Sequence, residues 1–362
     1  MKILHVETGR HLYGGPQQVL YLMQGLTERG HDCTLVCPPG SGIDSAARKL
    51  KMNVRNLFCA GDLDLPFAYR LVQFINEHEP DLVHCHSRRG ADILGGLAAS
   101  FADVPAVVSR RVDNTEMRLM AALRYRPFKR IIAISQKIAD VLTEHDVEEE
   151  RIAVIRSAVL TDRFAEPTDC AYMRAEFDVP DDAFVIASAA QLIPRKGHRF
   201  LLQAMADIKA THPNVHLIIF GQGPLETELR EQAASLGLGG NVQFAGFRED
   251  LDSYFTCLDL FVHPALKEGL GVATLKAQAA GVPVVAFEAG GLPESVVHGK
   301  SGLLVRPEDV DALRRAILRL VDDDELRAAY ANAAKDRMRD EFSVDTMVDR
   351  HVELYESMLD DE

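Results

Sequence analysis

Short, almost wholly apolar runs of strand length alternate with longer amphipathic segments along the entire chain. Residues 33–37, 184–189 and 216–221 are such runs, and each precedes a segment with apolar residues at helical spacing. A strand without a polar face must be covered by helices on both sides, as in parallel sheets. The alternation therefore predicts an α/β fold built on doubly wound parallel sheets.

The length of the chain, 362 residues, exceeds what one hydrophobic core usually organises and predicts two domains. Charged and turn-forming residues at 166–169 are typical of a linker, and the alternation restarts after them. We therefore expect an N-terminal domain over residues 1–166 and a C-terminal domain over residues 167–345.

Charge and cysteine usage exclude some classes of protein. A formal net charge of -14 argues against general nucleic-acid binding. The six cysteines are scattered, so we expect reduced thiols, without a disulfide framework or a cysteine metal site. Residues 2–6 already have the pattern of a strand where a signal peptide would lie, and no apolar run is long enough to span a bilayer. These features favour a cytoplasmic protein, attached at most to the inner face of the cytoplasmic membrane.

Residues 261–281 combine a short apolar strand, a loop with two glycines and a helix. Pro264 ends the strand, residues 268–271 read E-G-L-G, and residues 272–280 have a helical pattern that stops at Gly281. Free N–H groups and the positive end of the helix dipole make such a helix start an anion site. Glu268 lies at its mouth, where a carboxylate would accept hydrogen bonds from neutral hydroxyl groups, as a sugar presents them.

This stretch resembles the donor-site motif of the retaining glycosyltransferases of family 4, E-G-x-G-x-x-x-x-E-A-x-A-x-G. Glu268 matches the first Glu, which in the family holds hydroxyls of the donor sugar. Lys276 stands in place of the second Glu, which holds the ribose, and Gln278 replaces a small residue or Met. A lysine donates hydrogen bonds and cannot accept them from hydroxyls, so the ribose role does not carry over unchanged.

Other motifs of the family follow in its order over nearly the whole chain: G-G at 14–15, V-H-x-H at 83–86, K-G at 196–197, G-x-G-P at 221–224 and G-G-x-P-E at 290–294. The resemblance implies the GT-B fold, in which two Rossmann-like domains face each other across a cleft. The C-terminal domain holds the nucleotide sugar and the N-terminal domain holds the acceptor. A terminal helix at 346–362 would cross back and complete the N-terminal domain.

The resemblance also implies the site residues. We expect His86 and Glu268 to be catalytic by positioning the sugar. The donor-binding residues are expected to be Gly14, Gly15, Gln191, Arg195, Lys196, Gly221, Phe247, Arg248, Gly269, Leu270, Gly271, Val272 and Lys276. Gln191 replaces an Arg that neutralises the diphosphate in the family, and Arg195 could compensate for it. Taken alone, Gly14-Gly15 is as typical of a tight turn as of a phosphate-binding loop. Lys196 could be a solvated surface lysine.

His84 and His86 end an apolar strand. We expect them to point to opposite faces, so that only one can reach the cleft. A lone strand histidine is by default packed and hydrogen-bonded, and we assign that role to His84. His86 matches the second His of the family motif.

The segment 110–130 is basic in an otherwise acidic chain. Its candidate acceptor or membrane residues are Arg110, Arg111, Arg118, Arg124, Arg126 and Lys129, interleaved with apolar residues. A solvated helix face is the simplest interpretation. Two functional alternatives are an anionic membrane surface and a site for a phosphorylated or acidic acceptor.

The function implied by the resemblance is retaining transfer from a nucleotide diphosphate sugar, with a UDP-sugar as the first choice, to a glycan or glycolipid of the cell envelope. We expect no cofactor and no metal, because no Asp-x-Asp motif follows a strand and Lys196, loop amides and helix dipoles could neutralise the diphosphate. Gln191 and Lys276 leave a second hypothesis open: a nucleotide-sugar-binding protein or assembly partner with impaired catalysis. A nucleotide-sugar epimerase has no motif of its own here.

Overall fold

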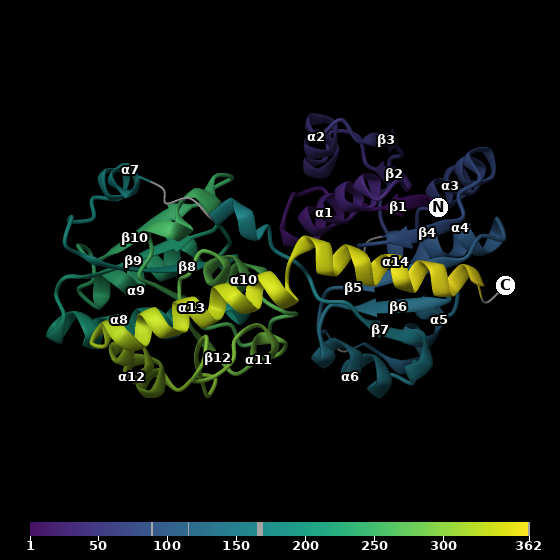
Figure 1. Ribbon diagram of the computed structural model, residues 1–362. Coiled ribbons are helices and arrows are strands. Elements are labelled where there is room, and N and C mark those ends of the chain that lie inside the picture. The colour runs from purple at the N-terminus through teal and green to yellow at the C-terminus, as the bar shows by residue number, and fades with distance from the viewer. Residues whose placement is uncertain (88–89, 115, 165–168, 361–362) are drawn as a thin grey trace. The chain divides into compact units, whose positions relative to one another are not determined.

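The computed structural model describes residues 1–87, 90–114, 116–164 and 169–360. The chain forms two compact units, one made of Met1–Ala158 with Val344–Glu362 and the other of Val159–Ser343 (Figure 1). The first unit ends before the expected boundary at residue 166 because the segment after it joins the second unit: the Val159 N–H bonds the Phe342 carbonyl at 2.9 Å. The expected linker at 166–169 lies outside the described residues apart from Asp169.

Unit 1 contains one seven-stranded sheet. Its strands are β1 (Lys2–Val6), β2 (Asp32–Cys37), β3 (Asn53–Asn56), β4 (Leu82–Cys85), β5 (Ala106–Arg110), β6 (Arg130–Ala133) and β7 (Ile152–Val154). Its helices are α1 (Gly14–Glu28), α2 (Gly42–Lys49), α3 (Leu65–His78), η1 (Ala91–Gly95), α4 (Gly96–Phe101), α5 (Arg118–Tyr125), α6 (Gln136–Glu144), η2 (Glu149–Arg151) and α14 (Val344–Asp360).

The strand order in unit 1 is β3-β2-β1-β4-β5-β6-β7, and the registered pairs are all parallel. Every residue of β4 and β5 is buried, as expected for strands covered on both faces. The order reverses between β1 and β4, and in such sheets ligands bind beside the carboxyl ends of the strands at this switch point. The register pairs His5 with His84 there.

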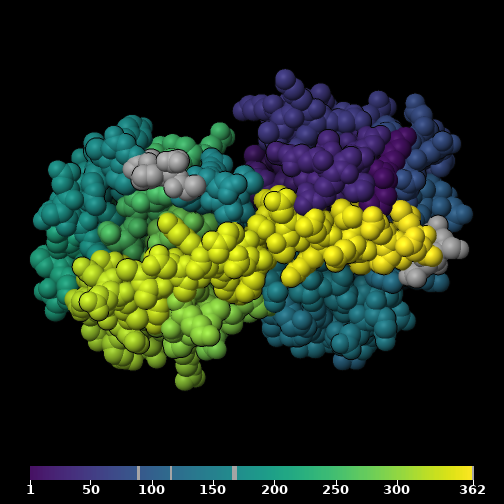
Figure 2. All heavy atoms as spheres, in the orientation of Figure 1, coloured from purple at the N-terminus to yellow at the C-terminus, as the bar shows by residue number. Residues whose placement is uncertain are grey.

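The C-terminal helix α14 belongs to unit 1, as expected, and packs on α1 (Figure 2). Gly25 permits the close approach, since a Cβ at that position would lie 2.5 Å from Cγ2 of Val348. Arg29 bonds the carboxylates of Asp345 and Asp349 across the same contact. Buried apolar side chains of both helices share one core cluster, so the two ends of the chain complete this unit together.

Unit 2 contains a six-stranded sheet. Its strands are β8 (Phe184–Ala189), β9 (Val215–Phe220), β10 (Val242–Gly246), β11 (Leu260–His263), β12 (Val284–Phe287) and β13 (Gly302–Val305). Its helices are η3 (Thr161–Phe164), α7 (Cys170–Glu176), η4 (Pro194–Lys196), α8 (His198–Thr211), α9 (Glu226–Ser235), η5 (Leu251–Ser253), η6 (Phe255–Cys257), α10 (Val272–Ala279), α11 (Leu292–Ser295), α12 (Val310–Val321) and α13 (Asp324–Glu341).

The strand order in unit 2, β10-β9-β8-β11-β12-β13, is again parallel and reverses between β8 and β11. A core of buried Leu, Ile, Val and Phe side chains connects this sheet with α8 and α12. The expectation of two doubly wound parallel sheets is therefore confirmed, and each unit has its own switch point.

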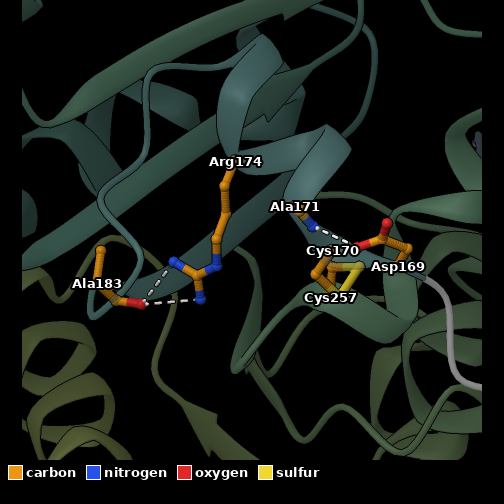
Figure 3. The surroundings of a disulfide bond; sticks show 6 residues. All are labelled: Asp169, Cys170, Ala171, Arg174, Ala183 and Cys257. Atoms are coloured by element: carbon orange, nitrogen blue, oxygen red, sulfur yellow. Dashed lines mark hydrogen bonds between the residues drawn. A yellow bond between two sulfur atoms is a disulfide. The ribbon is translucent and has the colours of Figure 1, made fainter.

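The expectation that all six cysteines are reduced is wrong for one pair. Cys170 at the start of α7 forms a disulfide with Cys257 at the end of η6, and Asp169 caps the same helix through the Ala171 N–H (Figure 3). The two cysteines are 87 residues apart in sequence, so spacing gave no sign that folding brings their Cα atoms to 5.4 Å. The other four cysteines are buried and form no disulfide.

No helix in the described residues combines the length and the apolar character that crossing a bilayer requires.

Candidate functional site

The E-G-L-G loop of unit 2 lies between β11 and α10, at the switch point of the sheet. Gly271 is the N-cap of α10 and has φ +88°, a conformation that favours glycine. Within the described chain, no acceptor bonds the backbone N–H groups of Leu270, Gly271 or Val272. The loop therefore presents unpaired amides at the positive end of a helix, as an anion site requires.

The carboxylate of Glu268 bonds the side chains of Lys196 and His263. Its Oε2 atom lies 2.5 Å from Nζ of Lys196 and 2.8 Å from Nε2 of His263, while Oε1 accepts the Gly269 N–H at 3.2 Å. Its side chain is 15% exposed. Burial alone would raise the pKa of Glu268, but the hydrogen bond from His263 and the charge of Lys196 outweigh it and hold that pKa well below the usual range. Glu268 is therefore an ionised acceptor.

Gly197 explains how Lys196 reaches Glu268. It has φ +71°, and a Cβ at this position would lie 1.9 Å from the carbonyl oxygen of Pro264. Any other residue would push the η4 turn away from the end of β11. The K-G pair thus places the lysine beside the carboxylate, which favours a site role for Lys196 over a solvated surface lysine.

The G-G-L-P-E loop supports the E-G-L-G loop from behind. The Gly291 N–H donates to the Glu268 carbonyl at 2.9 Å, and Cβ atoms at Gly290 and Gly291 would lie 2.1 Å from the carbonyl oxygens of Glu268 and Gly269. This close backbone packing fixes the direction in which the Glu268 side chain leaves the chain.

The remaining donor-binding candidates of unit 2 lie at the ends of β8, β9 and β10. Gln191 is exposed, and Arg195 is partly exposed. Gly221 has φ +131° and approaches the Ala190 carbonyl so closely that a Cβ would lie 1.9 Å from it. Phe247 is 47% exposed after β10. The neighbouring Arg248 is not free for a ligand, since it bonds Glu176 at 2.6 Å and Asp250 at 2.9 Å.

Lys276, on α10, is paired with a carboxylate. Its Nζ atom lies 2.7 Å from Oδ1 of Asp252, and Arg163 lies 3.1 Å from Oδ2 of the same residue. Gln278 is fully buried and bonds the Ser295 carbonyl at 2.8 Å, so it joins α10 to α11 instead of facing a ligand.

In unit 1, Gly14 and Gly15 open α1, and Arg111 follows β5. A Cβ at Gly15 would lie 3.4 Å from Cδ of Arg111, so the arginine lies against Gly15. Burial lowers the pKa of Arg111 to about 10 despite the attraction of Glu7. Arg111 thus brings a positive charge to the start of α1.

The expectation that His84 and His86 point to opposite faces is wrong. Residues two apart in a strand share a face, and the ring centroids of His84 and His86 lie 3.7 Å apart. The packing role expected for His84 agrees with its contacts: its nitrogens lie 2.6 Å from the Tyr355 hydroxyl and 2.8 Å from the Ser109 hydroxyl. His86 Nε2 lies 2.9 Å from Nδ1 of His5.

These three histidines are also a group that could hold a metal ion. One nitrogen from each of His5, His84 and His86 can be chosen so that all three lie within 4.8 Å of one another. Burial keeps the ring pair uncharged: it lowers the pKa of His5 to about 3, and it lowers the pKa of His86 well below the usual range, with a further contribution from His5 itself.

Two residues of the expected basic surface are not on the surface. Arg110 and Arg124 are only 4% and 9% exposed. Arg110 bonds Glu116 and Tyr125, and Arg124 bonds Asp92 and Glu116. Buried charges need partners, and the two arginines and two carboxylates of this network pair with each other. The exposed part is instead Arg118, Arg126 and the apolar side chains Met117, Leu119, Met120 and Leu123.

Sequence reasoning missed three residues that contact the candidates: His263, His5 and Asp252. His263 directly precedes Pro264 and could have been found as the last residue of β11, five positions before Glu268. His5 and Asp252 had no such signal, because each meets its partner across a long stretch of sequence.

Two family descriptions match the chain. The model "Glycosyltransferase Family 4" matches residues 13–163, and "Glycosyl transferases group 1" matches residues 172–337. The GDP-mannose-dependent alpha-(1-6)-phosphatidylinositol monomannoside mannosyltransferase of Mycolicibacterium smegmatis is 30% identical over 354 residues, 89% of each chain. The lipopolysaccharide core biosynthesis glycosyltransferase LpsE of Rhizobium meliloti is 28% identical over 362 residues, 99% of each chain.

Solved structures agree on the fold. HepE of Anabaena in complex with UDP has a TM-score of 0.88 at 24% identity, covering 99% of this chain and 100% of that one. A glycosyltransferase from Rickettsia africae has a TM-score of 0.89 at 21% identity, covering 100% and 99%. The architecture is GT-B, with two Rossmann-like domains. The chain belongs to glycosyltransferase family 4.

Proposed function

We propose that this glycosyltransferase moves a sugar, with retention of its anomeric configuration and without a metal ion, from a nucleotide diphosphate sugar to a glycan or glycolipid of the cell envelope. The observation that carries the proposal is the ionised Glu268 beside Lys196, at the mouth of a loop with unpaired amides. Carboxylate, ammonium and amides match the hydroxyls and the diphosphate of such a donor. UDP bound to HepE supports a UDP-sugar, while the mannosyltransferase relatives use GDP-mannose.

The chemistry that this geometry supports is a same-face displacement. The bond between the anomeric carbon and the diphosphate breaks, the acceptor oxygen bonds to that carbon, and a phosphate oxygen takes the acceptor's proton. Lys196 and the amides of residues 270–272 would stabilise the charge on the leaving diphosphate, each preorganised donor contributing roughly 3 kcal/mol. Glu268 and His86 would hold sugar hydroxyls. The product's anomeric configuration, read by NMR, tests retention.

We expect UDP at about 100 times its dissociation constant to stabilise the protein by about 2.7 kcal/mol, visible as a higher melting temperature. Lys196→Met should abolish most of that shift because the diphosphate loses its cation. Lys267→Met is the matched control, since Lys267 is exposed and adjacent to Glu268 without contacting it through an ion pair in the described structure. A shift with GDP alone would reassign the nucleotide, and no shift with any nucleoside diphosphate would contradict the proposal. Binding without release of nucleotide in the presence of acceptor extracts would identify the non-catalytic binder instead.

The surface of α5 supports an acceptor that lies in a membrane. Met117, Leu119 and Leu123 are 73%, 71% and 57% exposed. Arg118, which pairs with Asp146 at 3.4 Å, lies among them in the sequence, and the exposed Arg126 follows them. Exposed apolar side chains among cations suit the headgroup region of an anionic bilayer, where each nearby cation contributes about 1 kcal/mol. We therefore propose peripheral attachment through α5, which would bring unit 1 to a glycolipid acceptor.

The double variant Leu119→Ser/Leu123→Ser should bind phosphatidylglycerol vesicles about tenfold more weakly or worse, because two side chains no longer enter the bilayer. Vesicle co-sedimentation measures this. Leu63→Ser is the control, since Leu63 is 92% exposed on another segment of unit 1. Equal losses in both variants, or equal binding to neutral phosphatidylcholine, would rule out attachment through α5.

A further inference from the structure

His5 and His86 form a buried pair in unit 1, at the switch point between β1 and β4. Their exposed fractions are 0% and 2%, and Nδ1 of His5 lies 2.9 Å from Nε2 of His86. The outer nitrogens, Nε2 of His5 and Nδ1 of His86, have no hydrogen-bond partner among the described residues. A buried polar atom without a partner is costly, so these atoms need an explanation.

The protons of this pair can be counted. Burial lowers both pKa values, so each ring is neutral and carries one proton. One of the two protons lies in the N–H···N bond between the rings. The other must lie on an outer nitrogen, either Nδ1 of His86 or Nε2 of His5. The tautomer of His86 is therefore set by the tautomer of His5.

A bound ligand can distinguish the two arrangements. A proton on Nε2 of His5 is an unsatisfied donor inside the sheet, where the residue is fully buried. A proton on Nδ1 of His86 is unsatisfied only until an acceptor, such as a sugar hydroxyl oxygen, reaches it. Satisfying that donor favours the arrangement in which His5 donates from Nδ1 to His86.

We propose that His5 is a positioning residue, which donates from Nδ1 to Nε2 of His86 and so keeps His86 in the tautomer that donates a hydrogen bond to the transferred sugar. This inference rests on the proposed function through the role of His86. His84 packs against the pair: its ring centroid lies 3.7 Å from that of His86 in a tilted arrangement, and its nitrogens bond the hydroxyls of Tyr355 and Ser109.

The same contacts argue against a metal ion among the three histidines. Zinc requires a free lone pair from each histidine at about 2.0–2.1 Å. Both nitrogens of His84 already have partners, and the facing nitrogens of His5 and His86 share a proton in their own 2.9 Å hydrogen bond, so neither offers a free lone pair there.

Two substitutions of nearly equal shape test the role of His5. In His5→Asn the amide nitrogen stands two bonds beyond Cβ, where Nδ1 stood, and can donate to His86. In His5→Leu a methyl group takes that place. We expect kcat to fall roughly tenfold or more in His5→Leu, to stay within about threefold of wild type in His5→Asn, and the dissociation constant for UDP to be unchanged in both. Equal losses in the two variants, or no loss in either, would overturn the proposal.

A second measurement does not depend on turnover. Nitrogen-15 NMR of the histidine rings should show Nδ1 of His86 protonated in the wild type and in His5→Asn when the nucleotide sugar is bound, and a tautomer mixture in His5→Leu. A protonated Nε2 of His86 in the wild type overturns the proposal, as does a stoichiometric zinc ion that His5→Asn releases. Failure of the proposed function appears separately, as wild-type protein without donor turnover or as unchanged turnover in His86→Ala. The NMR spectra with bound nucleotide sugar do not require turnover and then decide the role of His5.

Discussion

Glu268→Gln is expected to lower turnover by about 10²–10³-fold while leaving the protein folded. The amide oxygen can still accept from Lys196 and His263, so these two hydrogen bonds remain, whereas the amide nitrogen in the place of Oε1 cannot accept the Gly269 N–H. In the proposed mechanism, the variant loses the negative charge that strengthens bonds to sugar hydroxyls as positive charge develops at the anomeric carbon, and one such preorganised group contributes about 2.7–4 kcal/mol. Release of nucleoside diphosphate in the presence of donor and acceptor measures the effect.

Glu288→Gln is the matched control for this variant. Glu288 is exposed at the end of β12, close in sequence to the supporting glycine loop, and should be replaceable without effect on turnover.

The pH dependence of unfolding provides a check on Glu268→Gln that does not involve catalysis. The pKa of Glu268 is depressed in the folded protein, so its charge contributes stability above its unfolded pKa, about 4.3, and this contribution is lost as the pH falls. The stability difference between wild type and Glu268→Gln should therefore shrink on acidification. Wild-type rates in Glu268→Gln would remove this residue from the site.

The fold could be predicted because its signals are local. Apolar strands such as residues 33–37 and 184–189 need helices on both faces, and the structure places each of them inside a parallel sheet. The E-G-L-G loop was predictable for the same reason, since strand, turn and helix start are adjacent in sequence and Gly271 adopts a positive φ. Local chemistry decides such elements without help from the rest of the chain.

The partners of the site residues could not be predicted, because they come from distant parts of the chain. His5 is 81 residues from His86, and Asp252 is 24 residues from Lys276. The expectation that Arg110 and Arg124 lie on a basic surface was wrong for a related reason. They pair with Glu116 and Asp92 inside unit 1, and sequence alone does not show which of several arginines pairs with a buried carboxylate. The structure also changes the interpretation of one departure from the family motif. Lys276, which replaces a Glu, is paired with the carboxylate of Asp252.

Reduction of the Cys170–Cys257 disulfide is expected to destabilise unit 2 by about 2–4 kcal/mol. The bond closes a loop of 87 residues, and a cross-link over a long loop removes much conformational freedom from the unfolded chain. For a unit of this size the loss corresponds to a fall in melting temperature on the order of 10 °C. Thermal unfolding with and without dithiothreitol measures it.

The double variant Cys170→Ser/Cys257→Ser separates the disulfide from other effects of the reductant. It should melt at the temperature of the reduced wild type and should not respond to dithiothreitol, because the remaining cysteines are buried and form no disulfide. Burial raises the pKa of Cys33 and of Cys37 to about 12, which keeps both unreactive. A wild-type melting temperature that ignores the reductant would show that the cross-link carries no stability.

The disulfide also links the stability of unit 2 to its candidate donor-binding residues. It anchors the start of α7 (Figure 3). The end of the same helix carries Glu176, which bonds Arg248 at 2.6 Å and the Tyr254 hydroxyl at 2.8 Å. Releasing α7 frees Glu176 from this cluster, and Arg248 then loses one of its two carboxylate partners beside the exposed Phe247. If these residues hold the nucleobase, reduction must weaken nucleotide binding as well as the fold, and the double variant must show the same loss in its affinity for UDP.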